Sequence, residues 1–480
     1  MYLCYYNKNV YLSQVPKYFK NQRTVLYYIN KNSKTPLHVQ LYEEIKKEII
    51  HTLNVGEKLN SIRKISTLYN LSKTSVESAY SQLVAEGYID SYPKSGYFVT
   101  DTNFKDFKNE VIVDDEEKID KIEYKYDFFH ARLEKSSFPL KLWKRIFNKA
   151  INESLDFCTY SEAQGEYGLR DEISKYLIKS RGVKCNASQV IVCNGFGDSM
   201  GLLIRLLNKK YDTFAIEHPG YQVARKAFET SAYKIKKIPI DHNGIDIEEL
   251  KKSKSKLVYI TPSHQYPTGV TIPIKNRLKL LDWANQNDAL IIEDDYDSEL
   301  NYENRPIPSL QGLDRNKKVV YVGTFAKSLS PALRVSYIIL PSYLLKEFNS
   351  TFESRVSLFT QKTLEVFMKD GHWDKHLRKI RTSNKKKHNL MKKLLIEKLG
   401  STMKIMNKGG GLSIHIYPNV DFDLDKLKSL AIENKIGLYF AKERVGGDWD
   451  AIMMGFGGLK IEEIEPAVQL FSTIWKESII

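Results

Sequence analysis

The sequence contains few cysteines, and it has no apolar run as long as a membrane span, which needs about 20 residues. Its four cysteines are Cys4, Cys158, Cys185 and Cys193, and they form neither a CxxC pair nor a zinc-ligand spacing. This spacing excludes a disulfide framework and a structural metal site, and free thiols suit a reducing compartment. The first residues also lack the apolar core of a signal peptide. We expect a cytoplasmic protein that holds no metal and does not associate with a membrane.

Acidic residues are fewer than basic ones. The chain has 58 Asp and Glu against 73 Lys and Arg, which gives a formal net charge of +15. A cationic excess favours polyanions such as DNA, although a lysine-rich solvated surface gives the same excess. Residues 1–34 hold six basic residues and no acidic ones, which fits either a basic arm or an extension without a role. The length of 480 residues leaves room for two or three domains.

Residues 35–100 predict a winged helix-turn-helix domain. Apolar residues at four-residue spacing predict a helix that begins after Pro36. Ser61 and Ser72 are candidate N-caps for two further helices, which end near Tyr69 and Glu86. Residues 88–99 then predict a two-stranded hairpin. This order of elements is typical of a DNA reader, although the domain holds seven basic and seven acidic residues and is neutral overall.

Residues 101–124 are polar and charged and predict a solvated linker, and residues 125–480 predict an α/β body. Short apolar strands alternate with helical segments in the body, at residues 189–193, 213–216, 257–260, 289–292, 319–322 and 335–340. Beyond about residue 341 the pattern predicts a smaller α+β domain. The basic run at residues 385–387, with Lys392 and Lys393, is interpreted as a solvated helix face.

The chemistry concentrates around Lys327. An apolar strand leads into Gly323 and Thr324, Lys327 follows, and Arg334 comes seven residues later. A lysine amine flanked by hydroxyls and an arginine suits covalent attachment of pyridoxal 5'-phosphate, with the arginine fork on the phosphate. Acids at the end of another apolar strand, Asp294 or Asp295, are placed to face the same crevice.

Two regions of the sequence resemble known families. Ser61, Arg63 and the run 72–76 (Ser-Lys-Thr-Ser-Val) resemble the GntR winged helix. The body resembles fold-type I pyridoxal phosphate enzymes of the aspartate aminotransferase kind, and the fusion in this order resembles the MocR/GabR-type subfamily of GntR regulators. The resemblance runs from about Thr35 to the C-terminus.

The resemblance implies a role for each residue of the cofactor site. Lys327 would bind the aldehyde, Asp294 would face the ring nitrogen, and Tyr296 would lie on the side of the ring O3′. The phosphate would be held by Gly195, Phe196, Thr324 and Arg334, and Tyr221 would stack on the ring. Tyr266 stands where the aminotransferases have an asparagine, and His264 is a candidate to replace that polar contact.

The same resemblance places DNA contacts and partners. The DNA-binding residues would be Arg63, Ser72, Lys73, Thr74, Ser75 and Lys94. A carboxylate-holding arginine is absent just before Gly455, so Arg444 and Arg225 are the candidates for binding an effector. The body is expected to form a homodimer.

Two functions are compatible with these residues. The first is a pyridoxal phosphate-dependent transcriptional regulator that binds double-stranded DNA and senses an amino acid or amine. The second is an active aminotransferase with an accessory DNA-binding domain. The departure at Tyr266 and the long linker favour sensing, and residual transaminase chemistry stays open.

Overall fold

The computed structural model describes residues 27–101, 123–152, 155–156, 158–302, 307–348, 354–406, 409–445 and 451–480. Contacts divide the chain into two compact units, residues 1–119 and 120–480. The predicted linker, apart from residues 101, 123 and 124, lies outside the described residues, as do residues 1–26 of the N-terminal segment. Each unit is described by itself.

The first unit is the predicted winged helix-turn-helix. It consists of α1 (Leu37–His51), α2 (Ile62–Tyr69), α3 (Lys73–Ala85) and the antiparallel pair β1 (Ile89–Tyr92) and β2 (Gly96–Val99). Both predicted caps are confirmed, because the hydroxyl of Ser61 accepts from the Lys64 amide at 3.3 Å and that of Ser72 accepts from the Ser75 amide at 3.1 Å. Such caps satisfy amides that the first helical turn leaves without partners.

The packed unit extends upstream of the predicted start at residue 35. The Tyr27 amide donates to the Tyr69 hydroxyl at 2.9 Å, and the Tyr27 hydroxyl donates to Glu48 at 2.6 Å. Tyr27 and Ile29 pack against the domain core, in which Ile45 and Leu83 are fully buried. The last part of the basic N-terminal segment is therefore folded onto the winged helix.

The body is built on a sheet that has eight strands in the described residues, in the order β4-β11-β10-β9-β8-β5-β6-β7. Strands β10, β9, β8, β5 and β6 run parallel to one another, whereas β11 is antiparallel to both β10 and β4, and β7 is antiparallel to β6. The strands are β4 (Val190–Cys193), β5 (Thr213–His218), β6 (Lys234–Asp241), β7 (Gly244–Ile245), β8 (Leu257–Ile260), β9 (Leu290–Asp295), β10 (Val319–Thr324) and β11 (Ser336–Ile339).

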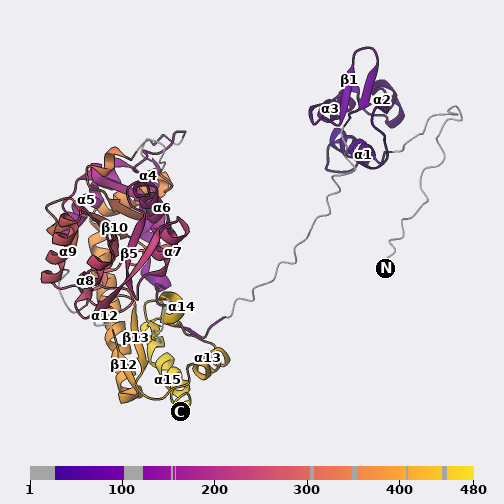
Figure 1. The fold of residues 1–480 in the computed structure, drawn as a ribbon. Helices are drawn as coiled ribbons and strands as arrows, with labels where there is room; N and C mark the ends of the chain where they lie inside the picture. Colours follow the sequence, from indigo (N-terminus) through magenta and orange to yellow (C-terminus); the bar gives the residue numbers. More distant parts are fainter. Residues whose placement is uncertain are drawn as a thin grey trace. The chain divides into compact units, whose positions relative to one another are not determined.

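Helices cover both faces of this sheet (Figure 1). Leu257 and Tyr259 of β8 pack with α6 and α7, and Val258 and Ile260 pack with α8 and α9 on the opposite face. Strands that are buried on both faces appear in the sequence as continuous apolar runs, and this pattern allowed them to be predicted. The helices are α4 (Leu140–Asn152), α5 (Tyr167–Arg181), α6 (Gly195–Leu207), α7 (Gln222–Thr230), α8 (Ile247–Lys252), α9 (Ile274–Gln286), α10 (Leu310–Leu313) and α11 (Leu358–Lys369).

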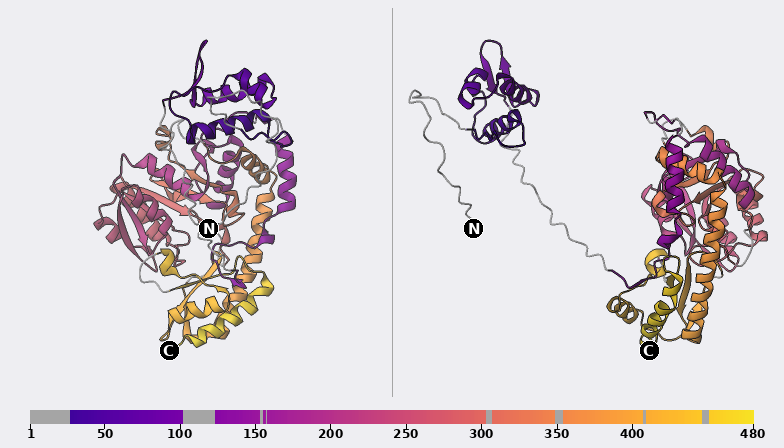
Figure 2. Two further views of the ribbon diagram at one scale, coloured as in Figure 1. Left: turned by 90° about the vertical axis from the view of Figure 1, so that its right-hand side faces the viewer. Right: turned by 180° about the vertical axis from the view of Figure 1, so that it is seen from behind.

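The predicted smaller C-terminal domain is present. The long helix α12 (His372–Leu399) runs from the large sheet to a three-stranded antiparallel sheet (Figure 2). That sheet contains β12 (Met403–Ile405), β13 (Ser413–Pro418) and β15 (Ile452–Gly455), and α13 (Leu424–Glu433), α14 (Ala441–Val445) and α15 (Ile461–Glu477) accompany it. A two-residue strand, β3 (Tyr126–Asp127), pairs with β14 (Ile436–Gly437) and ties the start of the body to this domain.

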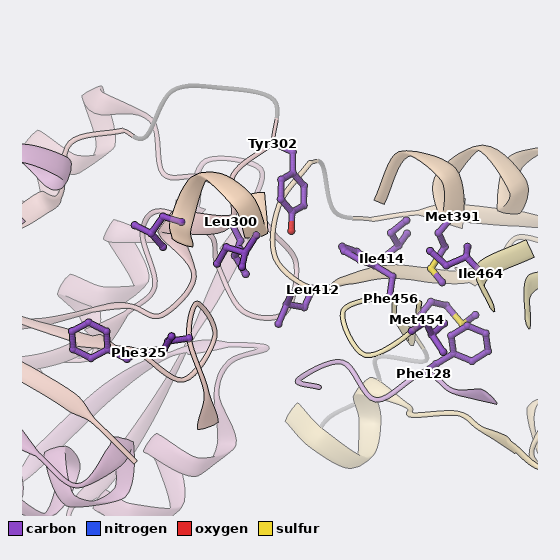
Figure 3. Packing of buried hydrophobic residues seen from close by; sticks show 14 of the residues in the cluster. Phe128, Leu300, Tyr302, Phe325, Met391, Leu412, Ile414, Met454, Phe456 and Ile464 are labelled. Atoms are coloured by element: carbon purple, nitrogen blue, oxygen red, sulfur yellow. The ribbon is translucent and has the colours of Figure 1, made fainter. Parts of the chain in front are cut away.

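One continuous apolar cluster joins the two parts of the body. It runs from Phe325 beside the large sheet, through Leu300 and Tyr302, to Met391 and Met454 in the small domain (Figure 3). These side chains are at most 5 % exposed. The small domain is therefore packed onto the large one.

Two sequence interpretations need correction. Lys387 does not belong to a solvated helix face, because its side chain is 3 % exposed and pairs with Glu134. The strand β6 was not predicted, because exposed lysines interrupt its apolar residues (Lys-Ile-Lys-Lys-Ile), so it forms no continuous apolar run. In the described residues, we find no helix with the length and apolar character needed to cross a bilayer.

Candidate functional site

A cavity of about 490 Å³ opens at the carboxyl ends of the parallel strands. Eight of the nine residues predicted to bind the cofactor line it, namely Gly195, Phe196, Tyr221, Asp294, Tyr296, Thr324, Lys327 and Arg334. Residues far apart in the sequence meet here because parallel strands end at one edge of the sheet, where ligands of open α/β sheets bind.

Lys327 lies in the turn that follows β10 and faces the cavity. Burial lowers the pKa of its ammonium group, and the charges of Asp297 and Asp294 offset only part of that effect. A lowered pKa increases the fraction of neutral amine, which is the form that attacks a carbonyl carbon.

The sequence left Asp294 and Asp295 as alternatives, and the structure separates them. Asp294 lines the cavity and accepts a hydrogen bond from the Tyr259 hydroxyl. Asp295 points to the other side of the sheet, where it accepts from Arg181 Nε at 2.7 Å and from the Tyr321 hydroxyl at 2.6 Å. Successive side chains of a strand point to opposite faces, so only one of the two reaches the cofactor side.

Burial raises the pKa of Asp294 from 3.8 to about 7, and the nearby carboxylates add to the rise, while the Tyr259 hydrogen bond lowers it. Without a cation beside it, this acid is therefore partly protonated near neutral pH. A protonated ring nitrogen would supply the missing positive charge, so the site suits a pyridine ring.

The start of α6 and Arg334 form a cradle that would suit a phosphate. Gly195 has φ = +76°, and a methyl group added to it would lie 2.6 Å from Arg334 Nη2. The guanidinium thus lies directly over a glycine backbone at a helix N-terminus. Backbone amides and an arginine at such a terminus form an anion-binding arrangement.

Aromatic rings form one wall of the cavity. The Tyr221 ring contacts Phe196 at a centroid distance of 5.1 Å and Tyr266 at 5.3 Å, both edge to face. The ring centroids of Tyr296 and Tyr266 are 6.2 Å apart. Thr324 presents its hydroxyl nearby, where it accepts from the Ala326 amide at 3.1 Å.

His264 lies outside the lining of this cavity. Its Nδ1 lies 2.7 Å from Asp297 Oδ2 and 3.3 Å from the Tyr296 hydroxyl. Its proposed contact with the cofactor therefore stays a prediction.

The two effector candidates are placed differently. Arg225, on α7, lines a separate surface groove and reaches Gln222 at 3.3 Å. Arg444 belongs to α14, and its side chain lies outside the described residues.

Sequence reasoning missed several lining residues. Phe129, His130 and Glu443 reach the cavity from segments that carry no motif, and Lys226 comes from α7. Tyr259 was also missed, although it precedes the lining residue Thr261 by two positions and the strand period would have indicated it.

The predicted DNA contacts lie on α2, on α3 and in the turn of the wing. Arg63, Lys73, Thr74 and Lys94 are exposed. Lys73 forms an exposed pair with Glu77 at 3.5 Å, while the hydroxyls of Ser72 and Ser75 bond to each other at 2.7 Å. Lys58 forms a backbone bridge with Phe98 of the wing, and its Nζ lies 5.6 Å from the centroid of that ring.

The cradle predicts the effect of adding one methyl group. Gly195→Ala should weaken binding of pyridoxal phosphate at least tenfold, because the methyl group displaces Arg334 and strains a backbone with positive φ. Gly197→Ala is the matched control on the same helix turn, since a methyl group there has nothing within 4 Å. Absorbance titration of the cofactor-free proteins measures the affinity of each variant for pyridoxal phosphate. Equal affinities of the two variants would contradict the cradle.

The raised pKa of Asp294 predicts a pH-dependent stability difference. The folded-state pKa of Asp294, about 7, exceeds its ordinary value of 3.8. Its contribution to the free energy of unfolding is therefore present below pH 3.8 and is lost as the pH rises through 7. Cofactor-free Asp294→Asn should therefore melt above the wild type at pH 8, and the difference should shrink as the pH falls. Thermal unfolding across this range tests it, with the exposed Asp282→Asn as control. A pH-independent difference would rule out the charge of Asp294 as its cause.

Comparison with known proteins agrees with this geometry. Residues 127–429 match the model of aminotransferase class I and II, and residues 37–99 match that of the bacterial regulatory proteins of the gntR family. An uncharacterized HTH-type transcriptional regulator of Bacillus subtilis, YdeL, is 35% identical over 94% of this chain and 99% of that protein. The probable rhizopine catabolism regulatory protein MocR of Rhizobium meliloti is 31% identical over 74% of this chain and 76% of its own length.

Solved structures show the same body fold. The multiple substrate aminotransferase of Thermococcus profundus aligns with a TM-score of 0.67 and 23% identity, over 78% of this chain and 99% of that one. The family match and the fit of Lys327, Asp294 and the Gly195–Arg334 cradle identify pyridoxal 5'-phosphate as the cofactor. The chain therefore belongs to the gntR family of bacterial regulatory proteins, in the MocR-type group that joins a helix-turn-helix to an aminotransferase class I and II domain.

Proposed function

We propose that this protein regulates transcription by binding DNA through its winged helix and sensing an amino acid or amine through its pyridoxal phosphate site. The observation that carries the proposal is the presence, in one chain, of a lysine–aspartate cofactor cavity and a capped recognition helix with exposed polar residues. When bound, the cofactor supplies an aldehyde that reacts reversibly with primary amines. That chemistry defines the effector class.

The residues of the cavity have distinct roles in this proposal. Lys327 offers an amine with a lowered pKa at the bottom of the cavity. Asp294 would face the ring nitrogen and favour its protonated form, and Arg334 with the Gly195 backbone would hold the phosphate. Tyr221 would pack on the ring. Tyr266, in place of an asparagine, leaves the ring oxygen without an amide donor, which favours recognition over rapid turnover.

The winged helix supplies the DNA contacts. The N-terminus of α3 presents Lys73 and Thr74, and α2 presents Arg63. The N-terminal residues of a recognition helix contact base edges in the major groove, and a wing lysine such as Lys94 suits a phosphate. Ser72 caps α3 in the free protein, where its hydroxyl accepts from the Ser75 amide and bonds to the Ser75 hydroxyl.

Coupling between the two sites is tested with Lys327→Ala. DNA affinity for the upstream region of its own gene is measured with and without a panel of amino acids and amines. We expect the variant to bind DNA as the wild type does and to lose the effector response, because it lacks the amine that would hold the cofactor. An effector acts only through a difference in affinity between two states of the body. A wild type that binds no such DNA at modest salt, yet transaminates an amino acid rapidly, would establish the aminotransferase alternative.

The DNA contact at Lys73 has its own test. Lys73→Ala should weaken binding, and the slope of log affinity against log salt should fall by about one if the contact is a phosphate. If Lys73 contacts a base edge, the loss should be about 1–3 kcal/mol and confined to one base position. Lys64→Ala, which removes a basic residue of α2, is measured in the same way, so that its affinity and salt slope can be compared with those of Lys73→Ala. Unchanged affinity for Lys73→Ala would remove this residue from the interface.

The body is proposed to act as a homodimer, so that two winged helices bind repeated half-sites. Sedimentation of the cofactor-loaded protein at micromolar concentration should give twice the chain mass of 55.6 kDa. A monomer under these conditions would contradict the dimer and the expected repeat of half-sites.

A further inference from the structure

The segment that precedes α1 folds back along this helix. Residues 27–35 lie upstream of α1, and the gntR family model matches from the first residue of α1 onward. The Asn30 amide donates to Gln40 Oε1 at 2.8 Å, and Gln40 Nε2 donates to Asn30 O at 3.1 Å. Further along α1, the Tyr28 amide donates to Glu44 Oε2 at 3.1 Å. We call residues 27–35 the N-terminal strap, and it lies outside the matched family domain.

Tyr27, the first residue of the strap, joins α1 to α2. Its hydroxyl donates to Glu48 Oε2 of α1 at 2.6 Å, and its amide donates to the hydroxyl of Tyr69, the last residue of α2, at 2.9 Å. The ring centroids of Tyr27 and Tyr69 are 5.5 Å apart. Both hydrogen bonds are partly buried, where water competes less for the donors and acceptors. One residue of the strap therefore holds the end of α2 against α1.

Lys31 bonds to the turn of the helix-turn-helix. Its Nζ donates to Asn70 O at 3.2 Å. Asn70 ends α2 with φ = +50°, and the chain then leads to Ser72, the cap of α3. The last carbonyls of a helix lack partners within the helix, and a lysine beside them is favoured by the helix dipole. The strap therefore also holds the turn that comes just before α3.

The helix α2 has little burial of its own to fix its position. Its buried residue is Ile65, whereas Leu68 is 46 % exposed. In contrast, α1 buries residues along its length, from Leu41 to Ile49. A helix as short as α2 is also marginal without tertiary contacts. Contacts at the end of α2 therefore help to fix the orientation of Arg63, one of the proposed DNA-binding residues.

We propose that the N-terminal strap positions the helix-turn-helix for DNA, with Tyr27 setting the end of α2 and Lys31 setting the turn before α3. The inference rests on the proposed function, because its consequence is the geometry in which Arg63 and Lys73 meet DNA. Tyr27 and Lys31 act through α2 and the turn, so they are positioning residues. Base contacts need a fixed helix orientation, whereas attraction to phosphates depends far less on it. Loss of a strap contact therefore lowers specific affinity more than non-specific affinity.

The test measures the affinity of the full chain, loaded with cofactor, for the upstream region of its own gene and for scrambled DNA of equal length. Tyr27→Ala should lower the first affinity about tenfold, because it removes a partly buried hydrogen bond and a ring contact, and should leave the second nearly unchanged. The ratio of the two affinities is the decisive readout, because partial unfolding would lower both by the same factor. Tyr27→Phe keeps the ring but not the bond to Glu48, so its loss should be smaller.

Lys31 is tested in the same assay. Lys31→Ala should lower the specific affinity about threefold, a smaller effect because its bond to Asn70 is exposed. The slope of log affinity against log salt should not change, since the partner of Lys31 is a protein carbonyl and not a phosphate. Lys34→Ala is the matched control. It removes the same charge from the strap, and Lys34 is exposed, with no hydrogen bond or ion pair to the described part of the chain. The affinity of this control should equal that of the wild type.

The inference is overturned if Tyr27→Ala and Lys31→Ala keep the wild-type ratio of specific to non-specific affinity. A salt slope that falls by about one in Lys31→Ala would assign this lysine to a phosphate contact and remove its positioning role. Tyr27→Phe replaces the alanine variant if circular dichroism shows that the latter is unfolded.

Failure of the proposed function can be distinguished from failure of this inference. If the wild type does not discriminate between the two DNAs, the proposed function is wrong, and hydrogen exchange of the full chain then decides about the strap. The amide of Leu71 bonds to Ser66 O at 3.1 Å at the end of α2. Amides at this end of α2 should exchange faster in Tyr27→Ala than in the wild type, and equal exchange would contradict the inference.

Discussion

The parallel register of β8, β9 and β10 is the constraint on which the cofactor site depends. Val322 lies opposite Asp294, and Ile260 lies opposite Glu293. Because these buried strands end together, the segments that follow them, with Thr261 and Lys327, meet around one cavity. A register shift of one residue would turn Asp294 to the far face and expose an unpaired acid to the core.

Buried charge at this sheet edge is arranged in two layers. On the far face, Arg181 pairs with Asp295 and also reaches Ser263 at 2.7 Å, so those charges are paired with each other and with hydroxyls. On the cavity side, Asp294 has a hydroxyl donor but no bonded cation among the described residues. The first arrangement stabilises the fold, whereas the second is complete only with a cationic ligand, and this difference separates the structural acid from the functional one.

The small domain contributes to the cavity. Glu443 reaches it, and the backbone at Gly411 packs against His264. His415 of β13 also bonds to Pro267 in the loop that carries Tyr266. The cavity that Lys327 lines therefore lies at the junction of the two domains.

The sequence by itself determined the winged helix, the apolar strands and the lysine of the cofactor site. Its caps, such as Ser61 and Ser72, and the buried strands are local or periodic signals, and Lys327 stands in a recognisable strand–turn context. The tertiary structure decided what depends on distant partners. It separated Asp294 from Asp295, brought Tyr259 and Phe129 to the cavity, paired Lys387 with Glu134, and placed Arg225 and His264 outside the cavity. Strand direction, side-chain facing and contacts across hundreds of residues are absent from any local pattern, so these placements required the fold.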